Sequence, residues 1–230
     1  NSDLFVFIDG PKSTDQLHLL DFVEMVALSF KNSFKTLNII RSDINLGGAA
    51  SQRKGISRIL SDYESIIVIE DDVIVSPYFL NYINRSLDLY KNNEKIWHIN
   101  GFCYPIKYDS QECFFSRLMF CWGWATWRDR WFKYINDPLY HDPYYLKNIY
   151  SKQMKNEFNL SSEINFYWSQ IESNLKGNIT WDIFWYSYIF LNNGLCLTPN
   201  ISYTKNIGHD SSGVHCSEDT ILQNLPINLK

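Results

Sequence analysis

Residues 65–80, SIIVIEDDVIVSPYFL, join a strand pattern to the densest group of acidic side chains in the sequence. Residues 66–69 form an unbroken apolar run rich in β-branched side chains, which is typical of a parallel strand covered on both faces. The acidic residues 70–72 follow this run directly. Ser76 and Pro77 then predict the cap and the first residue of a helix. The stretch therefore predicts a strand, an acidic turn and a helix, in that order.

Segments on both sides of this stretch continue the alternation of strands and helices. Strands are expected at 4–8, 36–40 and 96–99, and helices at 17–30 and 49–60, because apolar residues recur there with the matching period. This β-α-β order predicts an α/β fold with a Rossmann-like, mostly parallel sheet flanked by helices and joined by right-handed crossovers.

The second half of the chain has a different character. A further strand is expected within 114–120, and a Trp-Gly-Trp segment at 122–124 precedes Tyr- and Asn-rich helical pieces. Residues 180–191 are apolar on nearly all sides, which predicts a buried helix with Gly194 as its C-cap. We expect this half to form a helical, aromatic-rich subregion.

Size and composition limit the possible classes of protein. The 230 residues are 45% hydrophobic, which suits a single domain over 1–230 with halves 1–100 and 101–230. The net charge of −4 gives no electrostatic reason to bind nucleic acid. Aromatic residues make up 17%, and this excess either fills the core or forms a surface that stacks on sugar rings.

Cysteine content and hydropathy bear on the compartment. The five cysteines are an odd number without regular spacing, so we expect reduced thiols. The longest apolar stretch, 181–191, contains an aspartate and is too short to span a bilayer, and no signal peptide is expected. These features predict a cytoplasmic protein without a transmembrane segment, either free or associated peripherally with the inner face of the membrane.

The acidic turn indicates metal binding. Ligands of open α/β sheets bind beyond the carboxyl ends of the strands, where residues 70–72 are expected. Adjacent carboxylates repel one another, and a divalent cation such as Mg²⁺ or Mn²⁺, which prefers oxygen ligands, removes this conflict. The alternative is that these acids only decorate a loop before a helix, where negative charge is mildly favourable.

Two other positions fall on the same expected edge of the sheet. Asp9 and Gly10 end the first strand, so the Asp9 carboxylate is placed either to accept a hydrogen bond from a pyrimidine N–H or only to form a turn. Asn45 and Gly47 precede a helix whose N-terminus is suited to an anionic phosphate.

Three motifs, taken in order, carry a resemblance to a known family. They are NLGGAASQRKGI at 45–56, VIEDDVIVSPYFL at 68–80 and CWGWATWRDRW at 121–131. Together they resemble bacterial glycosyltransferases of the GT-A fold, in the family-two-like group, over about residues 4–216. Residues 69–80 are also similar to N-acetylglucosaminyltransferase I.

The resemblance implies a reaction and its partners. It implies an inverting, metal-dependent transfer of sugar from a nucleotide-diphosphate donor, UDP-linked, with Mn²⁺ or Mg²⁺ as cofactor. The acceptor would be a saccharide or glycolipid in bacterial surface polysaccharide or oligosaccharide synthesis. Such enzymes usually open with a strand that would precede the one expected at 4–8, so the first family strand is expected to be absent, which bears on donor affinity.

The resemblance also implies roles for individual residues. Asp72 matches the metal ligand, and His209 a further metal ligand or phosphate contact, with a zinc site including His215 and Cys216 as the alternative. Asp182 matches the catalytic base, with Asp210 and Glu163 next in line. The matched nucleotide-sugar contacts are Asp9, Gly10, Arg41, Asn45, Gly47, Arg53, Glu70 and Asp71. The matched acceptor contacts are Trp122, Gly123 and Trp124.

Two other functions remain open on the sequence. A nucleotidyltransferase that makes sugar nucleotides shares the α/β architecture and acidic metal sites, but it needs a Gly-rich loop with Arg and Lys near its amino terminus. A non-catalytic carbohydrate-binding module would use the Trp cluster to bind sugar without metal or nucleotide. Glycosyl transfer is the function that we carry forward.

Overall fold

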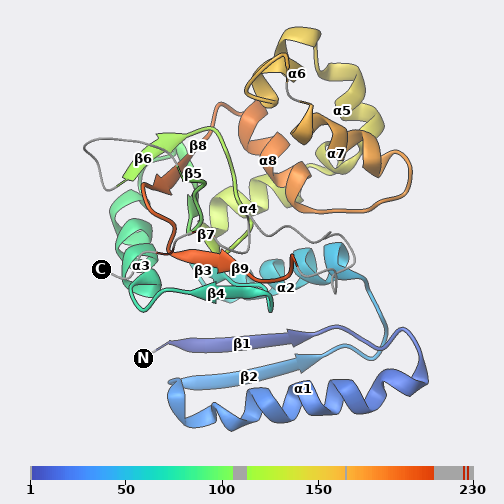
Figure 1. Ribbon diagram of the computed structural model, residues 1–230, viewed down its shortest axis with the longest axis vertical. Helices are drawn as coiled ribbons and strands as arrows, with labels where there is room; N and C mark the ends of the chain where they lie inside the picture. The colour runs from blue at the N-terminus through green and yellow to red at the C-terminus, as the bar shows by residue number, and fades with distance from the viewer. Residues whose placement is uncertain (1, 106–112, 164, 210–224, 226, 228–230) are drawn as a thin grey trace. The chain divides into compact units, whose positions relative to one another are not determined.

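The computed structural model describes residues 2–105, 113–163, 165–209, 225 and 227 (Figure 1). Internal contacts divide the chain into two compact units. The first unit comprises Asn1–Ile56 and Ile179–Trp181, and the second comprises Ser57–Asn178 and Asp182–Lys230. The predicted single domain, with halves meeting near residue 100, stays a prediction.

The first unit contains two strands and the helices that connect them. Its parallel strands β1 (Asp3–Ile8) and β2 (Thr36–Arg41) pair along their full length, as the period-matched segments predicted. The helices are η1 (Thr14–Gln16), α1 (Leu17–Ser29), η2 (Lys31–Ser33) and the first part of α2 (Gly48–Asp62). No residue of α1 is buried.

The second unit is built on a five-stranded sheet with the order β3-β7-β5-β8-β6. These strands are β3 (Ser65–Val68), β7 (Trp124–Trp127), β5 (Ile96–Asn100), β8 (Leu195–Pro199) and β6 (Cys113–Ser116). A separate antiparallel ribbon joins β4 (Val73–Val75) to β9 (Thr204–Asn206). Its helices are α3 (Phe79–Tyr90), α4 (Arg128–Ile135), η3 (Pro138–His141), α5 (Pro143–Ile149), α6 (Lys152–Phe158), α7 (Phe166–Asn174) and α8 (Asp182–Leu191).

The fold is α/β, as predicted, but the strand pairing is not mostly parallel. Among the six strand pairs in the described ranges, only β1–β2 and β5–β8 are parallel. Two of the four antiparallel pairs involve β7, a strand that the sequence analysis did not predict. It lies between β3 and β5 and runs antiparallel to both, so β3 and β5 keep a common direction without pairing.

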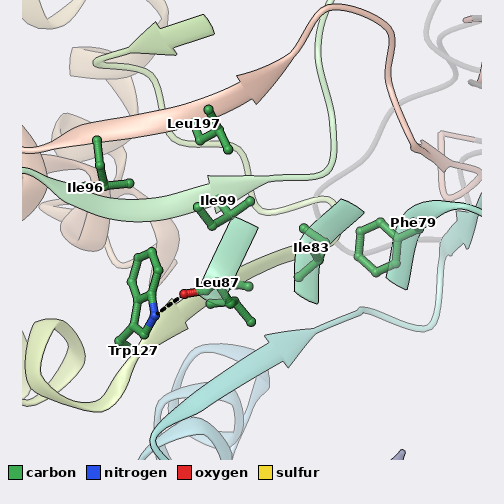
Figure 2. Packing of buried hydrophobic residues seen from close by; sticks show 8 residues of the cluster. Phe79, Ile83, Leu87, Ile96, Ile99, Trp127 and Leu197 are labelled. Carbon is green, nitrogen blue, oxygen red and sulfur yellow. Dashed lines mark hydrogen bonds between the residues drawn. The ribbon is translucent and has the colours of Figure 1, made fainter. Parts of the chain in front are cut away.

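One face of this sheet packs against α3. Phe79, Ile83 and Leu87 of the helix contact Ile99 and neighbouring apolar side chains of the strands, as Figure 2 shows. The Trp127 indole N–H donates to the Leu87 carbonyl at 3.1 Å, which ties the helix to β7 (Figure 2). Burial of this cluster is the main hydrophobic stabilisation of that face.

The opposite face holds a layer of aromatic rings beneath the helices α4 to α8, which Figure 1 shows gathered on that side. The His98 ring stacks on Trp124 at 4.9 Å, and Trp131 lies against Trp185 at 5.4 Å. Seven of the eight tryptophans are buried. Of the two explanations left open for the aromatic excess, core filling therefore accounts for the tryptophans other than Trp122.

The predicted helix ends are wrong at two places. Helix α3 begins at Phe79 rather than beside Pro77, because Ser76 and Pro77 form a turn in which the Ser76 hydroxyl accepts from Tyr78 N–H at 3.1 Å. After α8, the left-handed residue is Asn193, with φ 53°, rather than Gly194. No helix within the described ranges has the length and apolar composition needed to cross a bilayer.

His98 gives the fold a pH dependence that can be measured. The Trp185 indole donates to His98 Nδ1 at 3.2 Å, so Nε2 carries the proton and donates to the Phe120 carbonyl at 3.1 Å. Burial lowers the pKa of His98 to about 3. The unfolded chain, with a histidine pKa of about 6.5, therefore binds one more proton than the folded chain between these two values.

We expect the free energy of unfolding to fall as the pH drops below about 6.5, by up to about 1.4 kcal/mol per pH unit from His98 alone. His98→Gln keeps an acceptor and a donor without this titration, so its profile should be flatter. Urea denaturation of both proteins between pH 7 and 5 measures the difference. Parallel profiles would show that His98 is not neutral and buried.

Candidate functional site

The site is built where β3 ends and β7 begins. Val68, the last residue of β3, pairs with Trp124, the first of β7, and Trp124 also pairs with Asn100 at the end of β5. Residues 69–72, 121–123 and 101 therefore share one edge of the sheet. Gly101 N–H donates to the Gly123 carbonyl at 2.7 Å, which joins two of these segments.

Carboxylates gather around a cysteine at this edge. The Cys121 thiol donates to Asp182 Oδ2 at a distance of 3.8 Å. Burial, then the charges of Asp182, Glu70 and Asp72, raises the pKa of this thiol well above its ordinary value. Cys121 is therefore a neutral thiol that faces three acids. Asp71, the middle acid of the turn, is exposed.

Asp72 has one engaged and one unengaged carboxylate oxygen. Its Oδ2 accepts from Asn206 Nδ2 at 3.0 Å, and its backbone carbonyl accepts from Ile207 N–H at 2.8 Å. Its Oδ1 is buried and has no hydrogen-bond partner among the described residues. Buried polar atoms are normally paired, so such an oxygen fits a ligand that is bound during function.

A divalent cation fits this oxygen. Within the described residues, no group of three or more His, Cys, Asp and Glu side chains forms a ready-made metal cage. Mg²⁺ and related cations are commonly held by one or two carboxylates together with water and substrate phosphates. Asp72 is therefore suited to hold a cation jointly with a phosphorylated ligand.

Trp122 and His209 lie beside each other at this site. Their rings meet edge to face with centroids 5.2 Å apart, and Phe102 contacts the Trp122 ring at 4.5 Å. The Trp122 carbonyl accepts from the Thr204 hydroxyl at 2.7 Å. His209 follows Gly208, which lies against Asp72, so the structure brings His209, Trp122 and Asp72 to one neighbourhood.

The structure corrects the expected role of Trp124. Its side chain is 0% exposed and stacks on His98, so it belongs to the core and cannot stack on a sugar. The alternation of β7 explains this, because Trp124 and Thr126 face the aromatic layer. Trp122 is half-buried and remains available. Gly123 has φ +72°, which suits glycine at the bend that separates the two rings.

Asp182 opens α8 and is half-buried. Its contact with Cys121 places it at the same sheet edge as Glu70 and Asp72. Its role as a base stays a prediction. Of the two residues next in line, Glu163 is exposed, and Asp210 lies outside the described residues, as do His215 and Cys216.

In the first unit, Asp9 organises the loop that follows β2. Its Oδ1 accepts from the N–H groups of Gly10 and Leu46, each at 2.9 Å. Its Oδ2 accepts from Gly47 N–H at 2.9 Å and from Asn45 Nδ2 at 3.4 Å. A carboxylate offers about four acceptor positions, so these four donors occupy it. This geometry favours the turn-forming alternative for Asp9 over a base contact.

The two arginines expected to contact the nucleotide have different settings. Arg41, at the end of β2, pairs with Asp21 and with Glu24, the latter at 3.4 Å. The hydrogen bond that Arg41 donates to Asp21 is the main reason that the pKa of Arg41 is raised, and Glu24 adds to it. Arg53 lies half-buried in α2. Arg41 is therefore engaged with carboxylates of its own unit.

Sequence reasoning missed Asn206, Gly208 and Cys121. Cys121 directly precedes the Trp-Gly-Trp motif, and its place beside this motif is the signal in the sequence that could have identified it. Nothing local marks Asn206, because its contact with Asp72 joins residues 134 positions apart.

Comparison with known proteins adds no relative. Neither a scan of the chain against models of protein families nor a search of curated proteins returns a match. The functional argument therefore depends on the residues and their geometry.

The role of Asp9 in forming the loop after β2 can be tested by substitution. Asp9→Asn replaces one acceptor oxygen by an N–H₂ group that faces backbone N–H donors. We expect the unit to lose about 1 kcal/mol of stability, because a half-buried backbone donor would be left unpaired. Proteolysis of the loop and urea denaturation measure this, with the exposed Asp15→Asn as the matched control. Unchanged stability in Asp9→Asn would contradict the loop-forming role.

Proposed function

We propose that this chain is a metal-dependent, inverting glycosyltransferase that uses a nucleotide-diphosphate sugar, UDP-linked, and a saccharide or glycolipid acceptor. The proposed setting is bacterial surface polysaccharide or oligosaccharide synthesis. The observation that carries the proposal is the buried, unpartnered Oδ1 of Asp72 at the sheet edge beside Trp122 and Asp182. A GT-A fold and a cytoplasmic location belong to the same proposal.

The candidate site residues of the second unit have separate parts in this reaction. Asp72 holds the divalent cation, and His209 lies where it could add a contact to the cation or the diphosphate. When bound, the cation supplies positive charge against the diphosphate leaving group. The Trp122 ring offers an apolar face for a sugar. Glu70 and Asp71 remain the proposed ribose and phosphate contacts.

Asp182 is proposed to move the proton. Its carboxylate takes the proton of the acceptor hydroxyl, whose oxygen forms a bond to the anomeric carbon of the donor. The bond from that carbon to the diphosphate oxygen breaks, and the nucleoside diphosphate leaves with the electron pair. Because the raised pKa keeps Cys121 protonated, the thiol does not compete as a proton acceptor.

The metal site can be tested by ligand binding. We expect Asp72→Ala to abolish Mn²⁺-dependent binding of UDP while the protein stays folded. Calorimetry with UDP, other nucleoside diphosphates and their sugars, with and without Mn²⁺, measures this. Asp88→Ala is the matched control, because its carboxylate is exposed on α3 and pairs with Lys91 at the surface.

Several outcomes would count against this function. Equal Mn²⁺-dependent affinity for UDP in the parent and Asp72→Ala proteins would remove Asp72 from the site. Binding of free sugars without metal or nucleotide would favour a carbohydrate-binding module. Release of pyrophosphate from a nucleoside triphosphate and a sugar phosphate would favour a nucleotidyltransferase.

The proton transfer can be tested separately. Asp182→Asn cannot accept the proton, so we expect turnover to fall by about a hundredfold to ten-thousandfold. Donor affinity should stay unchanged. Turnover is measured as release of the nucleoside diphosphate, with Asp62→Asn on an exposed turn of α2 as the control. Near-normal turnover in Asp182→Asn would assign the base to another residue.

A further inference from the structure

The two carboxylate oxygens of Asp72 are chemically equivalent, so their surroundings decide which of them faces a cation. We infer that Asn206 and Gly208 are positioning residues that hold Asp72 so that it offers a cation Oδ1 alone. This inference deepens the proposed function and rests on it. Neither residue is expected to touch the cation or the substrate.

The first part of this argument is the Asn206 amide. Its Nδ2 donates to Asp72 Oδ2 at 3.0 Å, which occupies that oxygen and leaves Oδ1 without a partner. Its own Oδ1 accepts from Gly208 N–H at 2.7 Å. If the amide turned over, its N–H₂ group would face that N–H and its oxygen would face a carboxylate. The amide is therefore fixed in the donating orientation.

The second part is the backbone register. Asn206 is 3% exposed and pairs with Val73, the residue that follows Asp72. Ile207 N–H then donates to the Asp72 carbonyl at 2.8 Å, which extends the β4–β9 ladder by one step. Asp72 is thus held through both its main chain and its side chain by one short segment.

The third part is the close approach of Gly208. A Cβ added to Gly208 would lie 2.5 Å from Asp72 Oδ2 and 3.2 Å from its Cγ. Contacts below about 3 Å are essentially never tolerated, so only glycine fits without moving the carboxylate. Asp72 is therefore a preorganised ligand that presents one oxygen.

The test measures cation affinity and cation preference. Asn206→Leu removes the donor at nearly constant shape, and Gly208→Ala adds the Cβ that displaces the carboxylate. Mn²⁺ affinity is measured by the spin-resonance signal of free Mn²⁺, with and without UDP. Loss of a residue that orients a metal ligand typically weakens binding about 10-fold to 100-fold, and we expect that range for both variants.

Cation preference separates positioning from a general structural effect. Ca²⁺ accepts one or both oxygens of a carboxylate, whereas Mg²⁺-like ions demand stricter geometry. Freeing the carboxylate in Asn206→Leu should therefore weaken Mn²⁺ binding about tenfold more than Ca²⁺ binding. Equal loss of both cations, or no loss of Mn²⁺ affinity, would overturn the inference.

The controls are matched to each change. Asn192→Ala removes an amide that donates to the Tyr188 carbonyl at 2.8 Å, at the end of α8. Gly48→Ala adds a Cβ that meets nothing within 4 Å. Both should bind Mn²⁺ as the parent does. If Gly208→Ala fails to fold, Asn206→Leu decides the question.

The outcomes also distinguish the inference from the proposed function. If Asp72→Ala abolishes Mn²⁺-dependent UDP binding but Asn206→Leu and Gly208→Ala do not change it, the function stands and the positioning role is overturned. If the parent chain binds no Mn²⁺ with or without UDP, both the proposed function and the positioning role fail.

Discussion

Antiparallel pairing of β7 with β3 on one side and with β5 on the other is the constraint that organises the second unit. It aligns the end of β3 with the start of β7, so the acidic turn and the Trp-Gly-Trp segment meet at one edge. It also sends Trp124 and Thr126 to one face and Ala125 and Trp127 to the other. Trp122 precedes β7, and the bend at Gly123 separates this half-buried ring at the site from the fully buried Trp124 in the core.

The chemistry at this edge follows from unequal burial of similar groups. The acids of the turn are consecutive, yet Asp71 is exposed whereas Asp72 has a carboxylate oxygen closed off from solvent. Cys121 stays a neutral thiol because burial and the nearby carboxylates all oppose its ionisation. A site with concentrated negative charge and one unsatisfied oxygen attracts a cation more strongly than an exposed acidic loop would.

Local patterns in the sequence were enough to predict the main strands and helices of the first hundred residues, apart from the short strand β4. The apolar run at 66–69 and the helical periodicity of 17–30 come from neighbouring residues, and the structure has β3 and α1 there. The four residues of β7 are too few to show a period, and their partners lie far away in the chain. The sheet order and direction therefore could not be predicted. For the same reason, the acids were found at a strand end, but the contact of Asn206 with Asp72, across 134 positions, was not.

The buried oxygen of Asp72 has a consequence for how the protein tolerates change. Keeping such an atom from water without a partner costs the folded state about 1–3 kcal/mol, and more when the group is charged. Folded proteins have only about 5–15 kcal/mol of stability in total. Stability alone therefore gives no physical reason for an unpaired oxygen at this position. The second unit should also accept fewer destabilising substitutions elsewhere than a unit of equal size that carries no such deficit.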